Sequence, residues 1–256
     1  MTLDNVGTMN IILIDIKEIG KDGCVVLQDW RSDHIIKVLH GKCGDRVRIG
    51  ILNGPLGSGL IVEISSGKKT GRVVLKTTVV GSAPEPPMID LILALPRPIM
   101  LKKILTQATS MGVGRIFLIN ARRVEKSFFK ASLLADANYR SYLLHGLEQA
   151  VATTIPEVSI HNRFRPFVED LLPGIIGDYS SSIVAHPEAA PLSHINRNAI
   201  KGRLLLAVGP EGGWLEFEID KFREQGFIAV KLGERILRVD TAVVSLLAQV
   251  SVLRDI

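Results

Sequence analysis

Five short runs of nearly continuous hydrophobicity, separated by segments with helical periodicity, constrain the fold of this chain most strongly. They all follow residue 87 and are rich in Ile, Leu and Val, as strands buried on both faces should be. The alternation predicts an α/β fold with a parallel sheet and helices on both sides. The predicted strands are Ile89–Ala94, Arg115–Ile119, Ser182–Ala185, Leu204–Val208 and Ile228–Lys231, and the predicted helices are Met100–Ser110, Leu133–Ala152, Glu216–Gln225 and Thr241–Leu253.

The first third of the chain has a different pattern. Short β-like runs there are separated by turn residues, and one helix is predicted over Ser32–His40, with Ser32 or Asp33 as its N-cap. A proline-rich connection over residues 82–87 follows. We therefore predict two domains, a small β-barrel over 1–81 and the α/β domain over 82–256. The predicted barrel strands are Ile11–Ile16, Gly23–Leu27, Arg46–Ile51, Leu60–Ser65 and Gly71–Val79.

The composition argues against a membrane or a metal partner. Of the 256 residues 46% are apolar, but no apolar run approaches the ~18–20 residues that span a bilayer. The N-terminus, with Asp4 where a signal peptide carries positive charge, predicts a cytoplasmic protein. Cys24 and Cys43 form no CxxC pair and have no histidines at ligand spacing, so we expect free thiols and no metal site.

Positive charge is concentrated in the middle of the sequence. The stretch Arg97–Lys130 holds eight basic residues and one acidic residue, Glu125, although the net charge of the whole chain is only +5. A polyanion such as RNA is the natural partner of a one-sided field, while an ordinary solvated surface is the competing interpretation.

In a parallel α/β sheet the ligand site lies beyond the carboxyl ends of the strands. The most informative of these ends is Leu204–Val208, which runs into Gly209-Pro210-Glu211-Gly212-Gly213 and then a helix start. Glycines let the backbone approach a ligand closely, and a helix start offers free amides. The segment matches neither the dinucleotide fingerprint nor the Walker loop, so a plain tight turn remains an alternative.

A second segment supports a ligand site. Leu232–Ala242 places Ile236 and Leu237 between two arginines without any regular period, which suits an apolar wall for an adenine ring. The competing interpretation gives Asp240 or Thr241 the structural task of capping the last helix.

Together these segments resemble the paired C-terminal signature of the RsmE family of 16S rRNA uridine-N3 methyltransferases, in the SPOUT superfamily. Further matches occur in the same order along nearly the whole chain. They are Leu93–Pro98, Leu105–Val113, Arg122–Lys126, Glu148-Gln149 with Ile155-Pro156, and, in the first domain, His34–Leu39 with Gly44-Asp45.

The resemblance implies a PUA-like RNA-binding barrel, a SPOUT domain with a C-terminal trefoil knot, S-adenosylmethionine as cofactor, small-subunit ribosomal RNA as partner and a homodimer. It also implies site residues. For cofactor binding these are Leu95, Val208, Gly209, Pro210, Glu211, Gly213, Leu232, Gly233, Ile236, Leu237, Arg238 and Thr241; for RNA binding they are Arg31, His34, Lys37, Arg97, Arg122, Arg123 and Lys126.

The chain departs from the family pattern at several positions. Gln107 and Ser110 stand where the family usually has Lys and Glu, and no arginine is present near Ala152. His40 replaces a common arginine, and Asp240 replaces a common glutamate. The segments expected to bind the cofactor therefore match the family, whereas several positions expected on the substrate side or at the subunit interface differ from it.

For catalysis, methylation at uridine N3 requires loss of a proton and stabilisation of charge on O2 and O4. We expect Arg238 to stabilise that charge, helped by Arg122 or Arg123, and Glu211 or Asp240 to accept the proton. Two alternatives stay open: a related methyltransferase that acts on transfer RNA or another ribosomal site, and a non-catalytic RNA-binding assembly factor.

Overall fold

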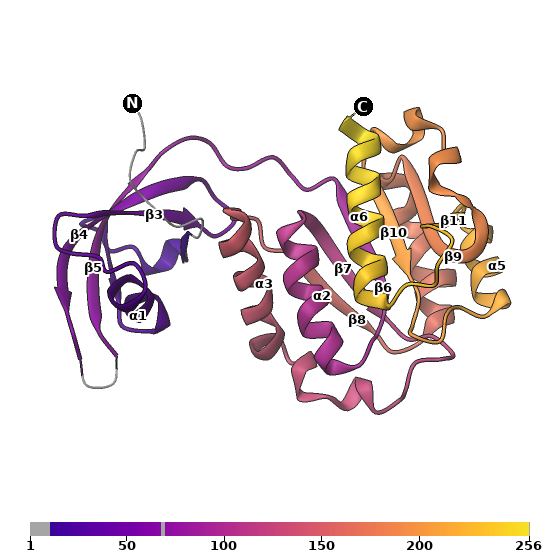
Figure 1. Cartoon of the computed structure of the whole chain (residues 1–256), viewed down its shortest axis with the longest axis horizontal. Coiled ribbons are helices and arrows are strands. Elements are labelled where there is room, and N and C mark those ends of the chain that lie inside the picture. Colours follow the sequence, from indigo (N-terminus) through magenta and orange to yellow (C-terminus); the bar gives the residue numbers. More distant parts are fainter. Residues whose placement is uncertain (1–10, 68–69, 256) are drawn as a thin grey trace. The chain divides into compact units, whose positions relative to one another are not determined.

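The computed structural model describes residues 11–67 and 70–255 and divides the chain into two compact units (Figure 1). The smaller unit comprises residues 1–85 together with 147–155, and the larger comprises 86–146 and 156–256. Residues 147–155 thus belong to the smaller unit, whereas the sequence predicted a single boundary between residues 81 and 82. The expectation of no signal peptide rests on residues 1–10, which lie outside the described residues.

The smaller unit is built on a mixed five-stranded sheet with the order β1-β3-β4-β5-β2. β1 pairs with β3 in parallel, and the other neighbours are antiparallel. Among the described residues β1 and β2 end this order, so the sheet forms half of a barrel where the sequence predicted a small β-barrel. The elements are β1 (Ile12–Ile14), β2 (Cys24–Leu27), α1 (Trp30–Lys37), β3 (Arg46–Ile51), β4 (Leu56–Ser65) and β5 (Arg72–Val79).

Helix α1 packs on this sheet through Ile35, which is fully buried in the core of the unit. The predicted range and cap of this helix were wrong. Its N-cap is Asp29, whose Oδ1 atom accepts a hydrogen bond from the backbone N–H of Arg31 at 2.9 Å. An aspartate before the first turn satisfies a backbone donor there, so the helix starts two residues earlier than Ser32.

Residues 147–155 are bound into the smaller unit by specific hydrogen bonds. The Thr153 hydroxyl donates to the Gly54 carbonyl at 2.6 Å, and the backbone N–H of Asn53 donates to the Thr153 carbonyl at 2.8 Å. Thr153 is only 3% exposed. Helix α3 (Asp136–Ala150) therefore begins in the larger unit and ends in the smaller one.

The larger unit is built on a six-stranded sheet, entirely parallel, with the order β11-β9-β10-β6-β7-β8. Helices α2 and α6 pack against each other and against strands β7 and β10 (Figure 1). The elements are β6 (Ile89–Ala94), α2 (Pro98–Ser110), β7 (Val113–Ile119), β8 (Glu157–His161), α4 (Leu172–Ile175), β9 (Ser181–Pro191), β10 (Leu204–Val208), α5 (Glu216–Glu224), β11 (Ile228–Lys231) and α6 (Val239–Asp255), with a π-helical segment at Pro166–Leu171.

A cluster of charged side chains closes the amino end of this sheet. Asp90, in β6, is fully buried, and its carboxylate accepts hydrogen bonds from the Arg115 and Arg203 guanidinium groups at 2.8–3.1 Å. The Tyr179 hydroxyl donates to the same carboxylate at 2.6 Å. Burial, together with that hydrogen bond, raises the pKa of Tyr179 well above its ordinary value. The cluster satisfies a buried charge from several sides, as stable burial requires.

The sequence predicted neither a membrane-spanning segment nor a metal site. Within the described part of the chain, no helix is long and apolar enough to cross a membrane. Nor does that part bring three His, Cys, Asp or Glu side chains together in an arrangement that could hold a metal ion.

Candidate functional site

A cavity lies at the carboxyl ends of strands β10 and β11 and beside the middle of β9, which pairs with both. Nine of the predicted cofactor-binding residues line it: Val208, Gly209, Pro210, Glu211, Gly213, Leu232, Gly233, Ile236 and Leu237. The glycine-rich segment after β10 and the apolar segment after β11, which are more than 20 residues apart in sequence, thus form walls of one cavity.

Three predicted cofactor-binding residues do not line the cavity. Leu95 is 1% exposed and donates its backbone N–H to the Ile119 carbonyl at 2.9 Å, so it belongs to the core at the end of β6. Thr241 is exposed in the first turn of α6. The Arg238 side chain is 76% exposed and lies beside Asp240, with 3.8 Å between Nε and Oδ1.

Strand β9 contributes a third wall. Its pairing with β11 shifts from Val184 opposite Ala229 to Ala190 opposite Val230, so the residues between Val184 and Ala190 bulge out of the ladder. Ala185, His186 and Pro187 of this bulge line the cavity. The apolar run indicated a strand that ends at Ala185, and a register shift of this kind leaves no local sequence signal.

The glycine-rich segment folds back on itself through Trp214, which also lines the cavity. A Cβ atom on Gly209 would lie 3.0 Å from the indole Nε1 atom, so glycine is needed there to admit the ring. Gly213 has a φ of 76°, in the left-handed region that favours glycine. Packing of the indole and a left-handed backbone conformation therefore account for two glycines of the motif, Gly209 and Gly213.

A buried carboxylate, Glu218, fixes the loop that follows β7 to the start of α5. Its side chain is fully buried and accepts hydrogen bonds from the backbone N–H groups of Arg122 and Leu215, both at 2.8 Å. The neighbouring Arg123 donates to the Gly212 carbonyl. Glu218 was not among the residues predicted from the sequence, although its place in the first turn of a helix is the position typical of an N-terminal capping residue.

The carboxylates predicted to accept a proton lie in different surroundings. Glu211 lines the cavity, and its Oε1 atom accepts a hydrogen bond from Arg97 Nε at 2.9 Å. The Asp240 side chain is 6% exposed and binds Lys103 Nζ at 2.7 Å through Oδ2. The hydrogen bond from Lys103 holds the pKa of Asp240 below its ordinary value.

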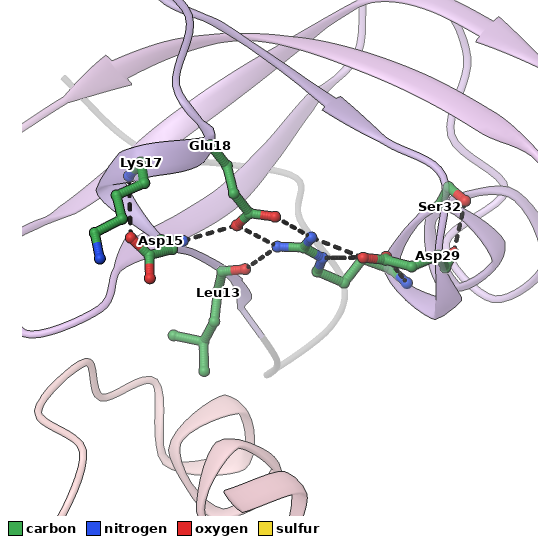
Figure 2. Close-up of polar contacts among 7 residues, drawn as sticks. Leu13, Asp15, Lys17, Glu18, Asp29 and Ser32 are labelled. Atoms are coloured by element: carbon green, nitrogen blue, oxygen red, sulfur yellow. Dashed lines mark hydrogen bonds and ion pairs between the residues drawn. The ribbon is translucent and has the colours of Figure 1, made fainter. Parts of the chain in front are cut away.

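Arg31 does not have the exposure predicted for an RNA contact. Leu13, Glu18 and Asp29 converge in the smaller unit (Figure 2), and their oxygens accept hydrogen bonds from all three guanidinium nitrogens of Arg31 at 2.5–3.1 Å. The Arg31 side chain is only 12% exposed. A guanidinium has five N–H donors, and these contacts use them, so we withdraw Arg31 from the set of RNA contacts.

The other predicted RNA-binding residues are more accessible. Arg97, Arg122, Arg123 and Lys126 are exposed in the larger unit. In the smaller unit, Lys37 is exposed beside Asp33 at 3.2 Å, and His34 is half-buried. Two other basic residues of the stretch Arg97–Lys130 are bound to acidic partners, Lys103 to Asp240 and Arg115 to Asp90. The basic stretch is therefore a weaker positive surface than its sequence suggested.

The comparisons with known proteins agree on one family. Residues 83–251 match the model of the RNA methyltransferase domain. The chain is 33% identical to the ribosomal RNA small subunit methyltransferase E of Treponema pallidum, over 91% of this chain and 87% of that protein. It is 24% identical to methyltransferase E 1 of Borreliella burgdorferi, over 93% and 95% of the two chains.

A solved structure shows the same fold. The ribosomal RNA small subunit methyltransferase E of Neisseria gonorrhoeae, bound to S-adenosyl methionine, superimposes with a TM-score of 0.73 at 23% identity, over 95% of this chain and 98% of that one. The matched domain and the full-length relatives lead to the same assignment. The chain belongs to the RNA methyltransferase domain family and, within it, to the RsmE family of ribosomal RNA small subunit methyltransferases.

Proposed function

We propose that this chain transfers a methyl group from S-adenosylmethionine to N3 of a uridine in 16S ribosomal RNA, and that it acts on the assembled small subunit. One observation carries the proposal. The two segments that resemble the family signature, far apart in sequence, line a single cavity at the carboxyl ends of parallel strands. This is the edge of an α/β sheet at which ligands bind.

The residues of the cavity suit an adenosyl compound. Val208, Pro210 and Leu237 supply apolar surface for a planar ring. Two polar side-chain atoms of the lining, Trp214 Nε1 and His186 Nδ1, are buried without a hydrogen-bond partner among the described residues. Buried polar groups normally have partners, so the cavity favours a ligand that carries both an apolar face and hydrogen-bonding groups.

We propose that the loops 208–213 and 232–237 hold the cofactor. When bound, it supplies an electrophilic methyl group on a sulfonium. The protein then has to orient the uridine, keep water away and stabilise the charge that forms as N3 loses its proton. The backbone of the two loops can approach the cofactor closely because Gly213 and Gly233 carry no side chains to obstruct it.

Arg238 is the proposed stabiliser of the uridine oxygens. Its side chain is exposed beside the cavity loop, and its nearest charged neighbour is Asp240. Fixed positive charge at the place where negative charge develops lowers a barrier most effectively in a site from which water is excluded. Nothing in the geometry forces Arg238 into a purely structural salt bridge, because its Nε atom is 3.8 Å from Asp240 Oδ1.

Of the two carboxylates, Glu211 fits the role of proton acceptor better. It lines the cavity, whereas Asp240 does not. The lowered pKa of Asp240 also makes it a weak base at neutral pH, since an effective base has a pKa near the working pH. We therefore assign Asp240 to positioning Arg238 and propose Glu211 as the acceptor.

The exposed basic residues Arg97, Arg122, Arg123 and Lys126, with His34 and Lys37 of the smaller unit, are the proposed RNA contacts. Such contacts position phosphates without reading sequence. From the family resemblance we also propose a trefoil knot in the larger unit, a PUA-like role for the smaller unit and a homodimer, which light scattering on the purified chain would test.

The proposal is tested by incubating the protein with labelled S-adenosylmethionine and small subunits that lack base modifications, followed by reverse-transcription mapping. Methylation at N3 blocks the pairing edge, so one strong stop at a uridine is the expected result. Labelling of transfer RNA instead would favour the related methyltransferase. Cofactor binding without transfer to either RNA would point to a changed substrate, and absence of cofactor binding would favour an assembly factor.

A further inference from the structure

We propose that the indole N–H of Trp214 is a cofactor-binding group that donates a hydrogen bond to an acceptor on the adenosine half of the ligand. This inference rests on the proposed function and assigns a residue to it that the sequence did not indicate. The observations behind it are the packing of the ring, its burial and the missing hydrogen-bond partner of its Nε1 atom.

The ring is held in a single place. Trp214 is 5% exposed, and its ring centroid lies 6.2 Å from that of Phe164 and 5.2 Å from that of Phe222. The face of the indole's five-membered ring lies over Gly209, where an added Cβ would be 3.0 Å from Nε1 and 3.1 Å from the two ring carbons beside it. Because aromatic packing and the glycine fix the ring, the direction of its N–H is fixed as well.

The polar atom of this ring is a donor in need of an acceptor. An indole nitrogen donates one hydrogen bond and accepts none. In buried tryptophans that donor normally finds a partner, but Nε1 of Trp214 has none among the described residues. Trp214 lines the cavity, as does Gly209, over which its ring is packed. The missing acceptor is therefore expected to come from the molecule that fills the cavity.

The surroundings of the indole favour a neutral acceptor. Val208, Pro210 and Leu237 form the apolar part of the same lining. Placing a carboxylate among apolar groups costs far more free energy than placing a ring nitrogen or a hydroxyl there. Adenosine offers such neutral acceptors, whereas the amino-acid half of the cofactor ends in charged groups. We therefore assign the hydrogen bond to the adenosine half.

Nuclear magnetic resonance can observe this hydrogen bond directly. The chain has two tryptophans, Trp214 and the exposed Trp30 of the smaller unit. In protein labelled with ¹⁵N-tryptophan, the Trp30→Phe variant identifies the Trp214 indole signal. On saturation with S-adenosylhomocysteine, that indole proton should move downfield and exchange more slowly, while the Trp30 signal stays in place. An unmoved Trp214 signal in a protein that binds the ligand would overturn the inference.

Affinity measurements test the same bond by removing it. Trp214→Phe keeps an aromatic ring beside Phe164 and Phe222 but has no donor, and the dissociation constant of S-adenosylhomocysteine should rise about tenfold. Replacement of the Trp214 indole by benzothiophene, which preserves the ring shape and lacks the N–H, should cause a similar loss of affinity. Trp30→Phe is the matched control and should bind as the wild type does.

The ligand 5′-methylthioadenosine, which lacks the amino-acid half, decides which half accepts the bond. An equal loss of affinity for both ligands in the two Trp214 variants supports the assignment. A loss for S-adenosylhomocysteine alone overturns it, and so does unchanged affinity in the benzothiophene form. If the wild type itself bound neither ligand, the proposed function would fail and the inference with it, an outcome that differs from failure in the variants only.

Discussion

The two ends of the six-stranded parallel sheet each bury an aspartate, but in different surroundings. At the amino end, Asp90 is fully buried, and the side chains of Arg115, Arg203 and Tyr179 donate hydrogen bonds to it. At the carboxyl end, Asp240 binds Lys103 through one oxygen, and its other oxygen, Oδ1, accepts no hydrogen bond from the described residues.

The difference separates stability from binding within one sheet. A closed polar cluster such as that of Asp90 has little capacity left for a ligand, and it specifies the arrangement of the strands around it. The carboxyl end keeps unused polar atoms at a cavity, together with an exposed arginine. We therefore expect changes at the amino end to alter unfolding, and changes at the carboxyl end to alter binding and turnover.

The largest effect is expected at the amino end. Asp90→Ala leaves the guanidinium groups of Arg115 and Arg203 without their shared carboxylate, and should lower the free energy of unfolding by about 3–5 kcal/mol. Urea denaturation measures the loss. The control is Asp220→Ala, which removes an exposed partner of Arg223 on α5 and should change stability by no more than about 0.5 kcal/mol. Equal effects of the two changes would contradict the distinction between the ends.

At the carboxyl end, Arg238→Ala should show the opposite profile. The rate of methyl transfer should fall about 100-fold, equivalent to about 2.7 kcal/mol of transition-state stabilisation. The unfolding free energy should stay within about 0.5 kcal/mol of the wild type, because the side chain is 76% exposed. Single-turnover kinetics and urea denaturation give the two values, with Arg223→Ala as the control. Full turnover in Arg238→Ala would remove this residue from the mechanism.

Lys103→Met tests the positioning role of Asp240. The change leaves a nearly buried carboxylate without its closest cation, and should cost about 1–2 kcal/mol of stability at neutral pH, since Lys103 itself is partly exposed. Lys102→Met, on the neighbouring lysine that lies over the Tyr142 ring, is the control. A decrease in turnover larger than the decrease in cofactor affinity is expected, because Arg238 loses its oriented neighbour.

The pH dependence of this variant has a defined sign. The pKa of Asp240 is lowered in the folded protein, so the pair stabilises the fold above the ordinary aspartate value of 3.8, and this contribution disappears as pH falls through the lowered pKa. Thermal unfolding of the wild type should therefore lose more stability between neutral and acidic pH than Lys103→Met does. Parallel curves for the two proteins would contradict the assignment.

The smallest effect is expected from a third buried carboxyl, Glu148, which lies in the smaller unit. Burial raises its pKa from 4.5 to about 7, although Arg31 acts in the opposite direction. The folded state therefore binds more protons than the unfolded state between these values, and stability should fall as pH rises through this window. Melting curves of Glu148→Gln should lack the decrease, while the exposed Glu157→Gln should retain it.

The sequence predicted those parts of the fold that depend on local pattern. The strands Ile89–Ala94 and Leu204–Val208 have the predicted bounds, because strands buried on both faces read as continuous apolar runs. Ile228–Lys231 also has the predicted bounds, although it is an edge strand with Ile228 exposed. Strand β8 was missed since it is an edge strand whose residues, Glu157–His161, alternate polar and apolar side chains and are only partly buried. The start of α1 was missed because Asp29 caps a turn that carries no apolar signal.

The residues of the site were likewise predictable only where a local pattern marks them. The segments after β10 and β11 were identifiable from their residues, whereas His186 and Trp214 were not among the predicted cofactor-binding residues. The first lies in a bulge created by a register shift between β9 and β11. The second lines the cavity because its ring folds back over Gly209. Both positions depend on tertiary pairing, which no local pattern encodes.

The most direct test of the account is the identity of the methylated nucleoside. Small subunits that lack base modifications would be treated with the protein and S-adenosylmethionine carrying a deuterated methyl group, and the RNA would be digested and analysed by mass spectrometry. Heavy 3-methyluridine is the expected product of the wild type, and its yield should be strongly reduced with Arg238→Ala. Heavy label in a different nucleoside, or equal yields of 3-methyluridine from both proteins, would contradict it.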